Sequence, residues 1–120
     1  MLELKTTDGR TLRLNAADID YFETASYNQQ GIIARVHQGQ HRWVVNTGPG
    51  NLLPFVEGAG AIVKRLGNEN KNGTYVVVGN IVGMVSNATD ADKTTVYFRS
   101  GAELHVGLPI GNVEQLLFGA

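Results

Sequence analysis

The chain has 120 residues, 42% of them hydrophobic and 18% charged, and a formal net charge of -1. This length suits one domain with one continuous core. The charge excludes a broadly basic nucleic-acid-binding surface, and the absence of cysteine excludes disulfides, thiolate zinc sites and cysteine nucleophiles. No segment has the apolar length of a signal core or a membrane span. We therefore expect no membrane contact and a cytoplasmic location, or a virion-associated one if the gene is carried by a phage.

Two short alternating segments open the chain. Residues 2–5 and 11–14 alternate apolar and polar side chains on either side of Asp8-Gly9, which predicts a β-hairpin with the positive φ angles of its turn at Asp-Gly. A third strand is predicted over residues 19–25. The turn formers of residues 26–31 then predict a loop.

The hairpin around Gly39 has two possible turn lengths, and each places different side chains on the two faces. The similar hairpin around Gly101 favours a three-residue loop, because this length puts Tyr97 and His105 on one face and the apolar residues on the other. The same register, transferred to the first hairpin, predicts one outward face with these residues: Ile33, Arg35, His41 and Trp43. It predicts an inward face with Ile32, Ala34, Val36 and Val44.

Apolar residues at helical spacing follow each hairpin. The spacing between Leu52 and Leu66 predicts a helix that ends before Gly67, and Gly48-Pro49-Gly50-Asn51 is interpreted as its entry. This entry has some likeness to a phosphate-binding loop, but it lacks both glycine-rich phosphate motifs. Residues 111–118 predict a second, shorter helix.

The chain is interpreted as a tandem repeat of one structural unit. At a spacing of 62 residues Ile19 matches Ile81, Gly39 matches Gly101, and Val44 matches Val106. We therefore predict an α+β fold made by tandem duplication of a unit of three or four antiparallel strands and a helix. The two units should be related by a pseudo-twofold axis, with the helices on one sheet face. The boundaries are 1–67 and 74–120, and an exposed, mobile linker is expected over 68–73.

Apolar and turn residues of the first half follow the order of a known family: Leu2, Leu4, Asp8, Gly9, Leu12, Leu14, Asn15, Ile19, Gly39, Val44 and Val45. In these positions the chain resembles the FlbD-type small flagellar and swarming-motility proteins, which implies a bacterial accessory role. That family has one copy of the unit, and it usually carries an acidic-serine stretch where this chain has Asn46-Thr47-Gly48. The order of elements is also similar to that of PUR and Whirly-type single-strand binders.

No set of residues predicts catalysis, a metal site or a cofactor. The histidines, His37, His41 and His105, have no metal-ligand spacing, and no serine lies in a nucleophile elbow. The short-spaced carboxylates of the chain lack the remainder of a calcium loop. We therefore expect no metal, no cofactor and no enzymatic activity.

Two functional hypotheses remain. The first is a protein interaction or assembly module, of a bacterial accessory or phage structural type, that forms homo-oligomers or binds another protein. Its candidate binding face contains Arg35, His41, Trp43, Tyr97 and His105, and its candidate oligomer contacts are Leu116, Leu117 and Phe118. The alternative is single-stranded nucleic-acid binding on the same face, because aromatic side chains beside cations can stack on bases and contact phosphates.

Overall fold

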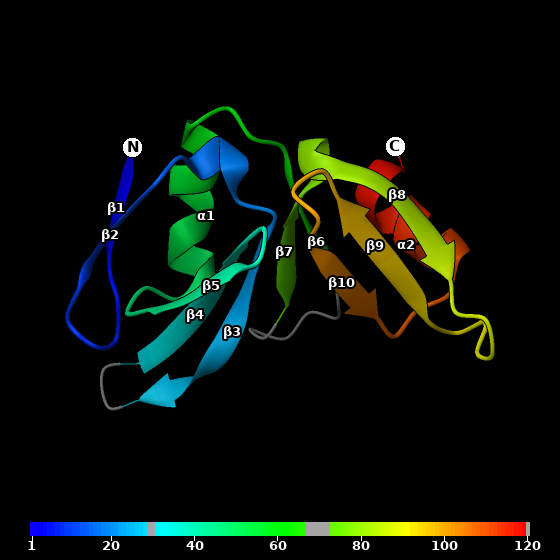
Figure 1. Ribbon diagram of the computed structural model, residues 1–120, viewed down its shortest axis with the longest axis horizontal. Helices are drawn as coiled ribbons and strands as arrows, with labels where there is room; N and C mark the ends of the chain where they lie inside the picture. The colour runs from blue at the N-terminus through cyan, green and yellow to red at the C-terminus, as the bar shows by residue number, and fades with distance from the viewer. Residues whose placement is uncertain (29–30, 67–72, 120) are drawn as a thin grey trace.

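The computed structural model describes residues 1–28, 31–66 and 73–119, which form an α+β fold of antiparallel sheets and helices (Figure 1). The first half contains β1 (Leu2–Lys5), β2 (Thr11–Leu14), the 3-10 helix η1 (Ala16–Asp18), β3 (Tyr21–Asn28), β4 (Gly31–Gln38), β5 (His41–Val45) and α1 (Pro49–Gly58). The second half contains β6 (Val63–Leu66), β7 (Thr74–Val77), the 3-10 helix η2 (Val78–Asn80), β8 (Ile81–Ser86), β9 (Thr94–Phe98), β10 (Glu103–Val106) and α2 (Ile110–Phe118).

Three sheets build the molecule. The largest has the strand order β5-β4-β3-β7-β6, a second has the order β10-β9-β8, and β1 pairs with β2 as the sequence predicted. Gly9 has a φ of 89°, so glycine alone supplies the positive φ angle of the β1–β2 turn. An isolated bridge between Thr6 and Val45 holds this hairpin beside β5.

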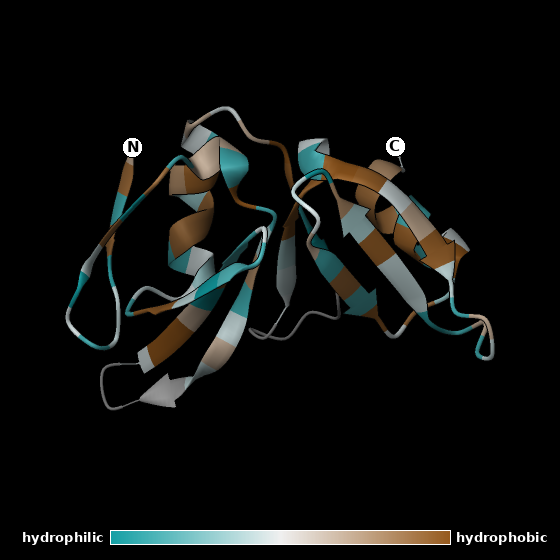
Figure 2. Cartoon of the chain, viewed as in Figure 1, coloured by the Kyte–Doolittle hydropathy of each residue, from teal (hydrophilic) through white to brown (hydrophobic). Residues whose placement is uncertain are grey.

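Two apolar clusters lie on opposite faces of the five-stranded sheet. Alternate residues point to opposite faces of a strand, and so Phe22 joins the cluster beneath α1 while Tyr21 joins the cluster around α2. The apolar bands along the strands and helices are visible in Figure 2. The two helices therefore pack on opposite faces of this sheet, and the prediction that both cover one sheet face is wrong.

The first helix is shorter than the sequence predicted. It begins at Pro49, as the entry motif indicated, but it ends at Gly58, and Val63–Leu66 forms β6 instead of the last helical turn. Gly60 has a φ of 94°, which reverses the chain after the helix. The segment after it then pairs with β7 from Val63↔Val77 to Leu66↔Thr74, and these backbone hydrogen bonds replace those of a helix.

The hairpin around Gly39 has a two-residue turn, so the predicted three-residue loop is wrong. Gln38 pairs with His41, and Gly39 has a φ of 61°, the positive value that the first position of a type II′ turn requires. Val36 therefore pairs with Trp43, which places Trp43 on the side of the α1 cluster. The hairpin around Gly101 does have the predicted three-residue loop, with Glu103 opposite Tyr97 and His105 opposite Thr95.

One strand pairing and one 3-10 helix recur in the second half at the same offset. Leu2 pairs with Leu14, and Lys64 pairs with Val76, 62 residues later at both partners. The 3-10 helices Ala16–Asp18 and Val78–Asn80 have the same offset. By this correspondence β6 and β7 match β1 and β2. Most of the predicted linker 68–73 lies outside the described residues.

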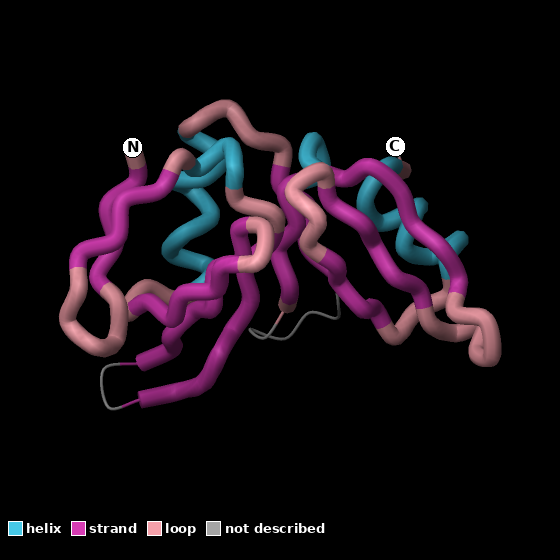
Figure 3. Tube along the Cα trace, in the orientation of Figure 1, coloured by secondary structure: helices cyan, strands magenta, loops and turns pink. Residues whose placement is uncertain are grey.

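The ends of the strands and helices define two edges of the molecule (Figures 1 and 3). The turn edge contains η1, η2 and the hairpin turns at Gly39 and Gly101. The helix-entry edge contains the first turn of α1, the start of β4 and the start of β7, whereas α2 begins towards the other end of the long axis, at the right of Figure 1. No helix within the described ranges is long and apolar enough to cross a membrane.

Candidate functional site

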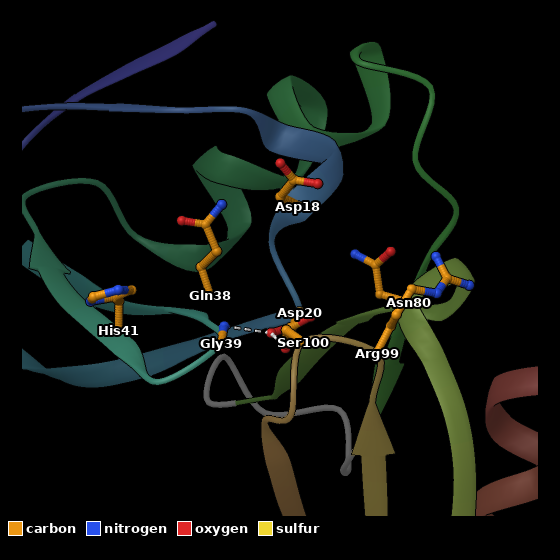
Figure 4. Close-up of a pocket in the computed structure, with 8 residues that line it drawn as sticks. All are labelled: Asp18, Asp20, Gln38, Gly39, His41, Asn80, Arg99 and Ser100. Atoms are coloured by element: carbon orange, nitrogen blue, oxygen red, sulfur yellow. Dashed lines mark hydrogen bonds between the residues drawn. The ribbon is translucent and has the colours of Figure 1, made fainter.

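A polar pocket of about 300 Å³ lies on the turn edge, where the two halves meet (Figure 4). Its lining residues come from both 3-10 helices and both hairpin turns: Asp18, Asp20, Gln38, Gly39, His41, Asn80, Arg99 and Ser100. Asp20 is only 1% exposed, and its Oδ2 accepts hydrogen bonds from the Gly39 N–H at 2.8 Å and from the Ser100 hydroxyl at 2.6 Å. One carboxylate therefore joins Gly39 and Ser100, which lie 61 residues apart in the sequence.

Asn80 makes a second polar connection in this pocket. Its side-chain Nδ2 donates to the Ala17 carbonyl at 2.8 Å and to the Ile19 carbonyl at 2.9 Å. The backbone carbonyl of Asn80 accepts from the Arg99 backbone N–H at 2.8 Å. These bonds satisfy backbone groups of both halves. The pocket thus contains the carboxylates of Asp18 and Asp20 and the guanidinium of Arg99, and the hydrogen bonds of Asp20 and Asn80 connect the two halves beside it.

The structure separates the binding face that the sequence predicted. His41 and Trp43 stack at 5.5 Å between ring centroids on the α1 side of the sheet, whereas Arg35 lies on the opposite face. Tyr97 and His105 lie on the outer face of the three-stranded sheet, where Tyr97 is 37% exposed. These residues therefore do not form one continuous face, because the shorter turn at Gly39 reverses the faces of β5.

Arg35 belongs to a charged cluster on the sheet face opposite α1. Glu23 Oε1 accepts from His37 Nε2 at 3.0 Å and lies 3.4 Å from Arg35 Nη1. The hydrogen bond from His37 is the main cause that lowers the pKa of Glu23, and the charges of His37 and Arg35 add to it. His37 also stacks on Tyr21 at 4.0 Å, and burial, followed by the charge of Glu23, raises the pKa of Tyr21 to about 12.

The helix-entry edge has a different chemistry. A pocket of about 390 Å³ lies at the start of α1, and no charged side chain among the described residues lines it: Gly31, Ile32, Asn46, Gly48, Pro49, Gly50, Asn51 and Tyr75. Arg65 lies over the ring of Tyr75, with its guanidinium carbon 5.7 Å from the ring centroid. Its Nε and Nη2 are buried and have no hydrogen-bond partner in the described part of the chain.

Neither the N-terminus of α1, which lies at this edge, nor that of α2 is neutralised by a side chain. Neither has an acidic residue in its first turn, and neither has a side chain that caps its free amides. A helix N-terminus carries a partial positive charge and unpaired N–H groups, which favour anions. The sequence showed the helix entry at Gly48, but its placement beside the starts of β4 and β7 depends on the fold.

The apolar residues near the C-terminus divide between the core and the surface. Leu117 is 1% exposed and belongs to the α2 cluster, so the prediction that it contacts another subunit is wrong. Leu116 and Phe118 are 42% and 52% exposed. Within residues 1–28, 31–66 and 73–119, no group of three or more His, Cys, Asp or Glu side chains is placed to hold a metal ion.

Comparisons with known proteins identify a structural neighbour. The LytTr DNA-binding domain of a response regulator from Bacillus cereus superposes with a TM-score of 0.59 at 13% identity, over 99% of this chain and 96% of that one. The two chains share a fold along nearly their whole length. No family model and no curated protein matches the sequence. The predicted resemblance to FlbD-type, PUR or Whirly proteins is therefore wrong: its turn and alternation pattern occurs here in a different fold, which also includes the second half.

Proposed function

We propose that this chain is a DNA-binding domain that contacts the phosphate backbone with its helix-entry edge. The whole-chain likeness to a LytTr DNA-binding domain is the observation that carries this proposal. The likeness includes both halves of the chain. The neighbour's function is transferred here as a hypothesis about this chain.

The chemistry of the helix-entry edge supports this choice of surface. The N-terminus of α1, which has no acidic residue in its first turn, favours phosphates. The buried Nε and Nη2 of Arg65, which lies over the Tyr75 ring of the same pocket, have no hydrogen-bond partner within the described residues. The amides of Asn46 and Asn51 add groups that contact phosphates and base edges. The long axis of the molecule, 41 Å, corresponds to about 12 base pairs at about 3.4 Å each.

The same observations favour duplex DNA over stacked single strands. A single-strand platform needs exposed aromatic rings on one face. Trp43 instead packs against the α1 cluster, and Tyr97 lies on a different sheet. A DNA-binding role needs no catalytic group, so we retain the expectation of a non-enzymatic protein, and we propose that it acts in the cytoplasm.

We also propose that the two halves arose by tandem duplication. The shared 62-residue offset of the β1–β2 and β6–β7 pairings supports this origin, as does the same offset of the two 3-10 helices. Under this proposal the first unit ends after α1, and the second begins at β6.

Fluorescence anisotropy with a labelled 20-base-pair duplex pool of random sequence tests the proposed function. If four phosphates are neutralised, affinity should fall by about 150-fold between 50 and 200 mM salt, because the slope is about -0.9 per phosphate. The matched control is a single strand of equal length, which should bind more weakly. Trp43→Phe should leave duplex affinity unchanged. No duplex binding at 50 mM salt and about 100 µM protein would overturn the proposal.

Self-association is a second candidate function, supported by exposed apolar residues in the second half. On the edge strand β8, Val82 and Val85 are 60% and 48% exposed, and Phe118 is 52% exposed on α2. Uncharged edge strands favour pairing with another chain. Sedimentation velocity at micromolar concentration should show an oligomer that Val85→Lys dissociates. Ile62→Lys, at a position 66% exposed in the first half, is the matched control.

A further inference from the structure

Basic residues gather at one end of the molecule. The β1–β2 hairpin, residues 2–14, and the neighbouring strand β5 together contain four Lys or Arg residues and two Asp or Glu residues. Residues 73–119 contain two Lys or Arg residues and four Asp or Glu residues. In Figure 1, β1 and β2 lie at the left of the long axis, and β8, β9 and α2 lie at the right. The local charge therefore favours approach of a polyanion to the hairpin end.

A pocket of about 250 Å³ lies at this end, between the β1–β2 turn and the free edge of β5. The Thr7 N–H donates to the Val44 carbonyl at 3.0 Å, which joins the turn to the strand. Successive side chains leave a strand on opposite faces, so Arg42 and Trp43 border the pocket from the two sides of β5.

Two arginines line this pocket, and they differ in their partners. Arg10 is held by Asp8, with its Nε 2.9 Å from Asp8 Oδ2. Hydrogen bonds from Thr6 and then from Arg10 lower the pKa of Asp8, so this carboxylate is charged at neutral pH. Arg42 is exposed and forms no ion pair with any residue that the structure describes. The lining therefore has two positive charges and one negative charge, and the guanidinium of Arg42 is available to an anion.

The pocket adjoins the helix-entry edge. Asn46, which lines the α1 pocket, donates its backbone N–H to the Lys5 carbonyl at 2.9 Å and its side-chain Nδ2 to the Thr6 carbonyl at 3.4 Å. Thr6 in turn lines the pocket beside β5. Asn46 thus connects the two pockets, and a molecule with several phosphate groups can contact both.

We propose that the pocket between the β1–β2 turn and β5 binds a phosphate group, with Arg42 as its main ligand and Arg10 as the second. The planar guanidinium of an arginine donates two parallel hydrogen bonds to a phosphate. The source of the group is the DNA backbone, an assignment that rests on the proposed function; a free phosphoanion offers the same chemistry. The DNA-contacting surface then extends from the start of α1 to the β1–β2 turn.

Trp43 reports on this pocket without DNA, because it lines the pocket and is the only tryptophan of the chain. Pyrophosphate, titrated at constant ionic strength, should change its fluorescence in a saturable way, and Arg42→Gln should weaken this binding about fivefold. Succinate, a dicarboxylate, should bind about threefold more weakly than pyrophosphate. Asp8→Asn removes the negative charge of the pocket and keeps an acceptor for Thr6, so it should strengthen pyrophosphate binding about threefold.

The salt dependence of duplex binding tests whether DNA occupies the pocket. Arg42→Gln should make the slope of log affinity against log salt shallower by about 0.9, the value for one phosphate. Arg13→Gln is the matched control, because it removes the same charge from the same hairpin. Arg13 is 70% exposed, lies 3.0 Å from Glu3 and does not line the pocket, so its loss should leave the slope unchanged.

The outcomes separate the phosphate site from the proposed function. Duplex binding with the same salt slope in Arg42→Gln and the parent protein overturns the DNA contact at this pocket and leaves the proposed function in place. No Trp43 response to pyrophosphate, or equal binding of succinate, overturns the phosphate site. Failure of the parent protein to bind duplex DNA overturns the proposed function, and the pyrophosphate titration still decides whether the pocket binds phosphate.

Discussion

Asn51→Asp is the substitution that most directly tests the helix-entry edge. Asn51 is exposed in the first turn of α1 and lines the pocket there. The change keeps the side-chain shape and adds one negative charge, with two consequences of opposite sign. It should stabilise the fold by about 0.3–1 kcal/mol, because a carboxylate in the first turn interacts favourably with the helix dipole. It should also weaken DNA binding, because the carboxylate repels a phosphate bound at the helix start.

The size of the loss follows from the spacing of the charges. For a phosphate roughly 6 Å from the new carboxylate and an effective dielectric constant of about 60, the repulsion is about 0.9 kcal/mol. This corresponds to about a fivefold loss of affinity at low salt. The loss should shrink as salt screens the repulsion.

Asn15→Asp is the matched control. Asn15 caps η1 on the turn edge by accepting from the Ala17 N–H at 3.2 Å, a role that aspartate retains. The molecule is 27 Å across in this direction, compared with a screening length of about 10 Å at 0.1 M salt, so DNA affinity should stay within about twofold. Urea unfolding and anisotropy measure the two effects. Equal affinity losses in both variants, or a lower stability of Asn51→Asp, would refute the reasoning.

Three further predictions concern stability. Leu117→Ala should lower the free energy of unfolding by about 2–5 kcal/mol, because Leu117 is 1% exposed. Leu116→Ala, at a position 42% exposed, should lower it by less than about 0.5 kcal/mol. Equal losses of stability in urea unfolding would contradict this prediction. The pKa of Tyr21 is raised to about 12, so its contribution to stability is complete below pH 10 and is lost as pH rises towards 12. In an alkaline titration followed by tyrosine absorbance, Tyr21→Phe should remove the ionisation step seen at the highest pH. The pKa of Glu23 is lowered from 4.5, chiefly by the hydrogen bond from His37, so its contribution is present above pH 4.5 and is lost as pH falls through the lower folded-state value. Glu23→Gln should therefore flatten the acid side of the stability profile, and identical profiles would argue against the pair.

Local patterns predicted much of the secondary structure. Alternation with a glycine turn correctly indicated the β1–β2 hairpin and the β9–β10 hairpin, and helical spacing indicated α2. These elements depend on neighbours within a few residues, which a sequence displays directly. The end of α1 was missed because Ile62, Val63 and Leu66 fit a helical spacing, and only pairing with β7 makes residues 63–66 a strand.

The candidate site was harder to predict, because one residue of turn length decides it. Gly39 suits both a two-residue and a three-residue loop, since each needs a positive φ at a single glycine. The choice between them moves Trp43 from the outer face to the α1 side. In the sequence, Asp20 is marked only as a carboxylate between Ile19 and Tyr21, which is weak evidence for a buried hydrogen-bonding role. Its partners at Gly39 and Ser100 are too distant in sequence for a local pattern to connect them with it.

The difference between the two hairpin turns explains how the halves are joined. The two-residue turn at Gly39 offers a backbone N–H to Asp20, whereas the three-residue turn at Gly101 offers the Ser100 hydroxyl. Two donors can share one carboxylate oxygen because a carboxylate accepts several hydrogen bonds. The donors approach from different sheets, so these hydrogen bonds add a directional connection to the apolar contacts that Tyr21, Leu66 and Val76 make with the α2 cluster.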